Sequence, residues 1–221
     1  MTSFWILALA LGIAFGDWFA LATGKQWLDY VAKPGVMIGL LASVHFSSLA
    51  PPMRMWFSLA LLFSLLGDIF LMLPKERFRA GLLSFLLAHL AYIAGFLRQA
   101  PPRWDVVPLL PLPIAAGTYM LGRRILAGLS ARGHQSLRIP VAVYMGVIAA
   151  MLLVAWGTWF HPNRPVGASV AVSVGALLFL LSDALLAWNR FVRPLAQARL
   201  KVRVLYHVGQ VLLVGGILLA G

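Results

Sequence analysis

Long apolar stretches, separated by short segments rich in proline, glycine and charge, constrain this chain more than any other feature of its sequence. A helix needs roughly 20 apolar residues to cross the hydrocarbon core of a bilayer. Of the 221 residues, 62% are hydrophobic and 11% are charged, a composition that a soluble domain of this length could not bury in one core. We therefore expect one all-α membrane domain over residues 1–221, with eight transmembrane helices at residues 4–22, 31–49, 54–73, 79–98, 104–122, 138–160, 166–188 and 202–220.

The first apolar stretch is expected to remain in the protein as a helix. Its end, Ala20-Leu21-Ala22, faintly resembles the cleavage site of a signal peptide. However, no basic segment precedes the stretch, and it contains Asp17, which a signal peptide would not favour.

Basic residues are unevenly distributed among the loops. With the loops numbered in chain order, the odd loops hold thirteen lysines and arginines and the even loops hold four. Cytoplasmic loops are enriched in these residues, so we expect the odd loops on the cytoplasmic side of the inner membrane and both termini on the other side. The same bias explains the net charge of +12 without a nucleic-acid partner. The thirteen are Lys25, Lys75, Arg77, Arg79, Arg123, Arg124, Arg132, Arg138, Arg190, Arg193, Arg199, Lys201 and Arg203.

The two halves of the chain share a short pattern. Residues 60–63, Ala-Leu-Leu-Phe, lead to Gly67-Asp68, and residues 176–179, with the same four residue types, lead to Ser182-Asp183. Both patterns fall in helices that run in the same direction. This favours two parallel repeats of four helices, an arrangement in which binding sites lie between the halves.

Six ionisable side chains fall inside the apolar stretches and at similar depth. Ionisable residues within a bilayer are costly and usually face the bundle interior with a functional role. In the expected topology, helices that end at the cytoplasm and helices that begin there bring these residues together in the cytoplasmic half. They are Asp17, Lys33, Asp68, His89, Asp183 and His207.

Further polar residues fall at the same depth and point to a shared cavity. Phe85, His89 and Tyr92 are spaced by four and three residues, which places them on one helix face. The others are Tyr144, Ser182, Asn189, Tyr206 and Gln210. The glycines around residues 209–216 are instead expected to allow close helix packing.

Each of these residues also has a structural interpretation. Asp68 and Asp183 could serve as hydrogen-bonding residues between helices, and His89 could be a buried structural histidine. Lys33 could extend its amine to the membrane boundary. Asp17, near a helix end, could be a solvated boundary residue.

The chain has no cysteine, which excludes thiolate chemistry and Cys-ligated zinc. When two carboxylates share a low-dielectric cavity, one can remain protonated while the other is ionised, which supplies a general acid and a partner base. Asp68 and Asp183 would suit acid-initiated cleavage through an oxocarbenium-like state, or proton-coupled transport. A zinc site formed by Asp68, His89, Asp183 and His207 would match no standard spacing, so we expect no metal and no cofactor.

These residues, taken in order, resemble the YhhN-like lysoplasmalogenase family of membrane proteins. The most specific part of the likeness is the pair Gly67-Asp68 and Ser182-Asp183. The rest of the likeness runs through Lys33-Pro34, Leu71-Met72, Gly81, Phe85, His89, Tyr92, Tyr144, Phe179, Tyr206 and Gln210.

The resemblance implies an eight-helix hydrolase that cleaves the vinyl ether bond of lysoplasmalogens, lysophospholipids held within the bilayer. The products would be a fatty aldehyde and glycerophospho-ethanolamine or -choline. By this likeness Asp68 and Asp183 form the catalytic pair, one as the acid and the other stabilising the cation or activating water. Residues expected to bind or orient substrate and water are Lys33, His89, Tyr92, Tyr144, Ser182, Asn189, Tyr206 and Gln210.

The sequence departs from the family pattern at two places. His207, Val208 and Gly209 follow Tyr206 where a second aromatic residue and alanine are usual, and Gly35-Val36 follow Pro34 where leucine or proline is usual. Two other functions stay open at this point: a proton-coupled lipid or small-molecule transporter, and a metal-dependent intramembrane lipid amidase or esterase.

Overall fold

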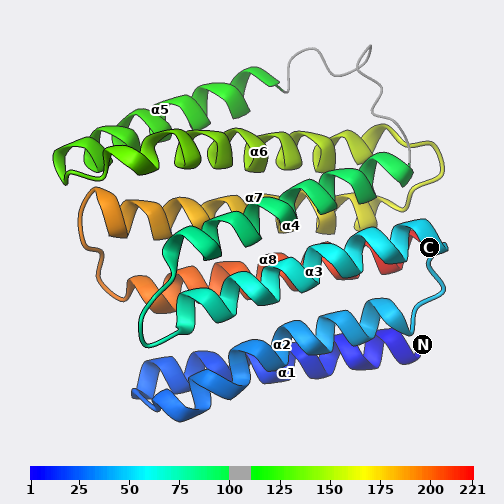
Figure 1. The fold of residues 1–221 in the computed structure, drawn as a ribbon. Helices are drawn as coiled ribbons and strands as arrows, with labels where there is room; N and C mark the ends of the chain where they lie inside the picture. Colours follow the sequence, from blue (N-terminus) through cyan, green and yellow to red (C-terminus); the bar gives the residue numbers. More distant parts are fainter. Residues whose placement is uncertain (100–110) are drawn as a thin grey trace.

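The computed structural model describes residues 1–99 and 111–221, and this part of the chain forms a bundle of eight α-helices without β-strands (Figure 1). Two short 3-10 helices, η1 and η2, flank α6. The elements are α1 (Thr2–Thr23), α2 (Gln26–His45), α3 (Pro51–Met72), α4 (Phe78–Gln99), α5 (Pro111–Ala131), η1 (Gln135–Leu137), α6 (Arg138–Gly157), η2 (Thr158–Phe160), α7 (Val166–Phe191) and α8 (Ala198–Ala220).

Helical hairpins make up most of the bundle. α1 packs along α2, α3 along α4, and α7 along α8. α8 also contacts α1 and α2, so it lies inside the bundle, whereas α5 lies at its edge against α6 and α7 (Figure 1). The polar residues of α8 therefore face the interior.

The α7–α8 contact depends on glycine. A methyl group added at Gly175 would lie 2.8 Å from the Gly209 carbonyl oxygen, and one added at Gly209 would lie 3.0 Å from the Gly175 carbonyl oxygen. Small residues let membrane helices approach this closely. The close-packing prediction for the glycines of α8 is confirmed, and the contact fixes α7, which carries Asp183, against α8, which carries Tyr206.

The exterior of the bundle is apolar, as expected for a protein whose solvent is lipid. Large hydrophobic side chains such as Trp5, Trp27, Tyr119 and Ile139 are exposed. Within the described residues, six helical segments are long and apolar enough to span a membrane: α1, α3, α4, α6 with its flanking 3-10 turns, α7 and α8. The chain is a multi-pass membrane protein.

Several helices are longer than the sequence predicted. α2 begins at Gln26 instead of residue 31, because Gly24, with a φ of 73°, ends α1 in a left-handed turn and the next helix starts at once. α5 continues to Ala131 instead of residue 122, just before Gly133, which has a φ of 76°. Residues 104–110 of the expected fifth helix lie outside the described residues.

These longer helices change the placement of some basic residues. Arg123 and Arg124 lie within α5, where their guanidinium groups contact the rings of Tyr119 and Trp188. α8 begins at Ala198 instead of residue 202, which places Arg203 in the second turn of the helix, where it is buried. Counting it as a loop charge was wrong.

The four odd connections nevertheless lie together at one end of the bundle, with both termini at the other (Figure 1). We call this the basic end, defined by residues 24–25, 73–77, 132–137 and 192–197. Asp68 and Asp183 lie toward the ends of α3 and α7 that reach it. The side of the membrane that the basic end faces stays a prediction.

Candidate active site

Asp68 on α3 forms a buried ion pair. Its Oδ1 is 2.8 Å from Nζ of Lys33 on α2, and its Oδ2 accepts a hydrogen bond of 2.8 Å from the Tyr206 hydroxyl on α8. The Asp68 side chain is only 2% exposed. A buried carboxylate is tolerated when it is paired and hydrogen-bonded. Lys33 therefore has an interior partner instead of reaching the membrane boundary.

Asp183 on α7 contacts a tyrosine and a histidine from two other helices. Its Oδ2 is in hydrogen-bond contact with the Tyr144 hydroxyl on α6 and lies 3.4 Å from Nε2 of His89 on α4. The same His89 nitrogen is 3.0 Å from the Tyr144 hydroxyl, and Nδ1 is 3.2 Å from the sulfur of Met151. His89 is fully buried, whereas the Asp183 side chain is 14% exposed. Asp183 is thus the more accessible of the two aspartates.

Both aspartates line one polar pocket of about 390 Å³ toward the basic end. Six of the ten predicted site residues line it: Lys33, Asp68, Ser182, Asp183, Asn189 and Tyr206. The charged residues that line it are Asp29, Lys33, Asp68, Glu76, Asp183, Arg190, Arg199 and Arg203. The sequence prediction that Asp68 and Asp183 face a common cavity agrees with this arrangement.

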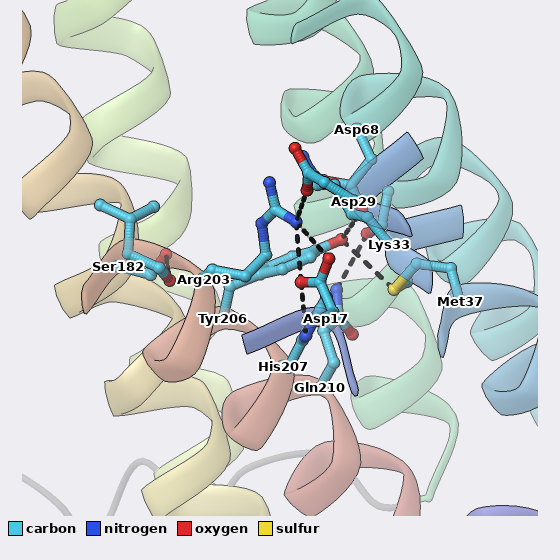
Figure 2. A network of polar contacts seen from close by, with 12 residues as sticks. Asp17, Asp29, Lys33, Met37, Asp68, Ser182, Arg203, Tyr206, His207 and Gln210 are labelled. Atoms are coloured by element: carbon cyan, nitrogen blue, oxygen red, sulfur yellow. Dashed lines mark hydrogen bonds and ion pairs between the residues drawn. The ribbon is translucent and has the colours of Figure 1, made fainter. Parts of the chain in front are cut away.

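Two of these pocket residues also hold the backbone in place. The Ser182 hydroxyl donates to the Val202 carbonyl at 3.0 Å, which links α7 to α8. The Asn189 side-chain oxygen accepts a 2.8 Å hydrogen bond from the amide of Leu195, in the turn between these helices. In Figure 2, Ser182 lies apart from the charged residues.

Tyr92 and Gln210, also predicted to orient substrate, contact each other instead of the pocket. The Tyr92 hydroxyl donates to Oε1 of Gln210 at 2.5 Å, and Nε2 of Gln210 donates to the Ser64 hydroxyl at 3.1 Å. This buried chain ties α4, α8 and α3 together. Ser64, Tyr92 and Gln210 are fully buried, so they support the helices that carry the site and do not line its pocket.

A second, apolar pocket of about 240 Å³ lies between α4, α5, α6 and α7. Its lining includes Leu82, Gly117, Ile125 and Ile148. Asp183 lines this pocket and the polar pocket alike, together with Leu71, Phe85 and Leu186. Asp183 is therefore the carboxylate at the junction of an apolar and a charged space.

A buried charge network borders the polar pocket and was missed by sequence reasoning. Nη1 of Arg203 donates to both oxygens of Asp17, at 2.9 and 2.7 Å, and to Oδ1 of Asp29, at 2.6 Å. Nη2 of Arg199 donates to the other oxygen of Asp29 at 3.1 Å. Figure 2 shows the Arg203 guanidinium group facing Asp17 and Asp29, beside the Lys33–Asp68 pair. Asp17 is fully buried, so its interpretation as a solvated boundary residue is wrong.

A sequence signal for this network existed. Arg203, Tyr206, His207 and Gln210 follow the spacing of one helix face, which places Arg203 beside residues already assigned to the interior. Asp29 precedes Lys33 by four residues and shares a face with it in the same way.

His207, on this same face of α8, is fully buried beside the network. Its Nδ1 lies 3.7 Å from Oδ2 of Asp17, too far for a hydrogen bond, and its ring stacks near Trp18. Across residues 1–99 and 111–221, no three His, Asp or Glu side chains converge in an arrangement that could hold a metal ion. The zinc set considered from the sequence is therefore not assembled.

The fold and this site define a polytopic membrane protein with two aspartates, Asp68 buried and Asp183 partly buried, at a pocket shared by its helices. The family model described as the YhhN family matches residues 28–217, and the chain belongs to that family. No solved structure matches the chain.

Curated relatives agree with this membership. The chain is 36% identical to lysoplasmalogenase TMEM86B of Sus scrofa over 154 residues, which cover 70% of this chain and 59% of that protein. It is 27% identical to a lysoplasmalogenase of Mycobacterium tuberculosis over 233 residues, covering 96% and 82% of the two chains. It is 26% identical to the membrane protein YhhN of Escherichia coli over 191 residues, covering 86% and 88%. The chain thus spans less than two thirds of the length of TMEM86B. It spans more than four fifths of the length of each of the two bacterial relatives.

Proposed function

We propose that this protein is a membrane hydrolase that cleaves the vinyl ether bond of lysoplasmalogen-type lysophospholipids. The products are a fatty aldehyde and glycerophospho-ethanolamine or -choline, and no cofactor takes part. The observation that carries the proposal is the position of Asp183 at the junction of the apolar and polar pockets. Membership of the YhhN family, and the relatives named lysoplasmalogenase, support the same activity.

The two pockets suit the two ends of a single-chain lipid. The hydrocarbon chain occupies the apolar pocket, whose lining includes the exposed Gly117 of α5, so the chain reaches it laterally from the bilayer. The glycerophospho group occupies the polar pocket. A vinyl ether lies between the chain and the glycerol, which brings its alkenyl carbons next to Asp183.

The headgroup phosphate is best matched by arginine. Lys33, which the sequence placed among the substrate-binding residues, already pairs with Asp68. Arg203 and Arg199 both line the polar pocket, and the contacts of Arg203 with Asp17 and Asp29 use Nη1 alone. The other guanidinium nitrogens of Arg203, together with the guanidinium group of the largely exposed Arg199, supply the planar donors that phosphate prefers.

The chemistry follows from the two carboxylates. Protonation of the alkenyl carbon gives an oxocarbenium ion, which water captures to form a hemiacetal that collapses to the aldehyde. One aspartate delivers the proton, and the other stabilises the cation or directs water. Low-dielectric surroundings strengthen such electrostatic stabilisation.

We also propose that all eight α-helices cross the membrane, with both termini on the non-cytoplasmic side and the site in the cytoplasmic half of the inner membrane. A parallel duplication is supported by the partners of the aspartates. Asp68 contacts Lys33 from the preceding helix and Tyr206 from the last helix of the other half. Asp183 contacts Tyr144 from the preceding helix and His89 from the last helix of the other half. In a repeat of four helices, α2 corresponds to α6, α3 to α7 and α4 to α8, so the two aspartates have partners from equivalent helices.

The test is a product assay with purified protein in detergent and lysoplasmenyl-ethanolamine or -choline as substrate. We expect fatty aldehyde and the glycerophospho product to appear in equal amounts. An acyl lysophospholipid of the same chain length should not be cleaved. Loss of activity on chelation would favour the metal-dependent esterase instead. In proteoliposomes, intact substrate moved to the opposite leaflet by a proton gradient would favour the transporter.

The apolar pocket yields a separate prediction about chain length. Gly117 of α5 lines this pocket, and a Cβ added there would meet no atom within 4 Å, so we expect Gly117→Phe to narrow the pocket and leave the fold intact. We expect kcat/KM for long-chain substrates to fall roughly tenfold relative to short-chain ones, since displacing about two methylenes costs roughly 1.6 kcal/mol at about 0.8 kcal/mol each. The matched control is Gly146→Phe, on exposed α6 surface with equally open space. Equal chain-length preference in the two variants would place the lipid chain elsewhere.

A further inference from the structure

We infer that Asp183, Tyr144 and His89 together hold one transferable proton and that Asp183 is the acid that delivers it to the substrate. The inference rests on the proposed function and assigns the roles within its catalytic pair. It comes from counting hydrogens along the contacts of these three side chains. The starting point is the one partner that carries no polar hydrogen, Met151.

Met151 fixes the tautomer of His89. A thioether sulfur accepts hydrogen bonds weakly and donates none. Nδ1 of His89 is 3.2 Å from this sulfur, so Nδ1 must carry a hydrogen. In neutral histidine the other ring nitrogen is then an acceptor. Nε2 therefore has to receive a hydrogen from its own neighbour.

That neighbour is Tyr144, which has one hydrogen and two contacts. Its hydroxyl is 3.0 Å from Nε2 of His89 and also contacts Oδ2 of Asp183. If the hydroxyl donates to neutral His89, its oxygen needs a hydrogen from Asp183, which must be protonated. If it donates to Asp183 instead, His89 must be protonated on both nitrogens. Both arrangements contain the same extra proton, and only its position differs.

Burial favours the neutral arrangement, with the proton on Asp183. His89 is fully buried and Asp183 largely so, and creating two opposite charges in such surroundings costs desolvation energy. Asp183 also has no lysine or arginine in contact among the described residues. The proton is therefore stored at the edge of the polar pocket.

Asp68 is the opposite case. Lys33 contacts one of its oxygens and the Tyr206 hydroxyl donates to the other. Two donors, one of them cationic, favour the ionised carboxylate. Asp68 is thus the charged member of the pair, suited to stabilise the oxocarbenium ion or to orient water.

The reaction closes without a co-reactant. A half-turn of the Asp183 carboxyl group brings its O–H to the pocket, that bond breaks, and the alkenyl π electrons form a C–H bond at the carbon remote from the ether oxygen. Water adds to the other alkenyl carbon, and one of its hydrogens returns to Asp183. The hemiacetal hydroxyl hydrogen then passes to the ether oxygen as the C–O bond breaks. Asp183 ends protonated, ready for another cycle.

Removing His89 should change the pH dependence of catalysis. In His89→Gln, the proton of Asp183 loses its alternative acceptor, so we expect the alkaline limb of the kcat/KM profile to move to lower pH. The ordinary pKa values of aspartic acid and histidine, about 3.9 and about 6.5, differ by about 2.6 units, so the shift should not exceed that difference. Activity should recover to within a few-fold of wild type at acidic pH. Tyr144→Phe, which breaks the link, should move the limb in the same direction.

The control for this change is His45→Gln, an exposed histidine at the far end of α2. Other titrating groups are unchanged in all variants, including those that face Asp183 across the polar pocket: Asp29, Lys33, Asp68, Glu76, Arg190, Arg199, Arg203 and Tyr206. A His89→Gln profile that coincides with wild type, or an equal loss at every pH, would overturn the inference. Tyr144→Phe decides the question if His89→Gln does not fold.

An infrared measurement tests the stored proton without any substrate. At neutral pH, wild-type protein should show a carboxylic-acid C=O band that is missing from Asp183→Asn and from His89→Gln and present in His45→Gln. A wild-type spectrum without a band lost in Asp183→Asn would refute the inference. If the band behaves as expected and no lysoplasmenyl lipid is cleaved, the proposed function fails while the stored proton stands.

Discussion

Asp183→Asn is expected to abolish aldehyde release while leaving the protein folded. The amide has the shape of the carboxyl group and keeps the contact with Tyr144, but it delivers no proton to carbon. Loss of a general acid lowers rates by roughly 10²–10⁴-fold, so turnover should fall to the detection limit. The measurement is aldehyde release by purified variant and wild type at equal concentrations, with thermal unfolding in detergent recorded for both.

A comparison with Asp68→Asn sharpens this prediction. That substitution leaves Lys33 buried without its counter-charge, so it should lower the unfolding temperature as well as activity. The double variant with Lys33→Met should regain stability and not activity. Aldehyde release by Asp183→Asn within tenfold of wild type would remove Asp183 from the catalytic step.

Arg203→Met is expected to cause the largest loss of stability. It leaves Asp17 and Asp29 buried side by side without the guanidinium group that neutralises both. Breaking a buried ion pair from one side costs about 3–5 kcal/mol, because the remaining charge is uncompensated. The unfolding temperature in detergent should therefore fall by several degrees or more.

The matched control is Arg199→Met, one turn earlier on α8. Arg199 pairs with Asp29 as well, but its side chain is 72% exposed, and such pairs contribute about 0–1 kcal/mol. Replacing both aspartates by asparagine in the Arg203→Met background should recover part of the lost stability. Equal unfolding temperatures for Arg203→Met and Arg199→Met would show that the network does not support the fold.

The sequence predicted the helical bundle and the gathering of polar residues because both depend on local patterns. Apolar stretches of membrane-spanning length define helices, and polar residues at matching depth must meet if consecutive helices alternate in direction. The predicted boundaries were less accurate where a helix continues past a charge, as α5 does beyond Arg123. Arg123 and Arg124 are exposed on α5 and contact the rings of Tyr119 and Trp188, so a charge in an apolar stretch does not by itself end a helix.

The pairing of charges could not be predicted in the same way. Arg203 contacts Asp17, which is 186 residues away in the sequence, and no local pattern encodes which helices pack together. Loop counting therefore assigned Arg203 to the surface. The distinct surroundings of Asp68 and Asp183 depend equally on long-range packing, since their partners come from α2, α4, α6 and α8.

Hydrolysis of a lysoplasmenyl lipid in D₂O tests the central claim most directly. Acid-initiated cleavage transfers one solvent-derived hydrogen to the alkenyl carbon remote from the ether oxygen. This carbon becomes the one next to the aldehyde carbon. When the aldehyde is reduced at once to the alcohol, that carbon should carry one deuterium. Unlabelled aldehyde incubated with protein in D₂O for the same time controls for exchange. Aldehyde released without deuterium at that carbon would contradict the account.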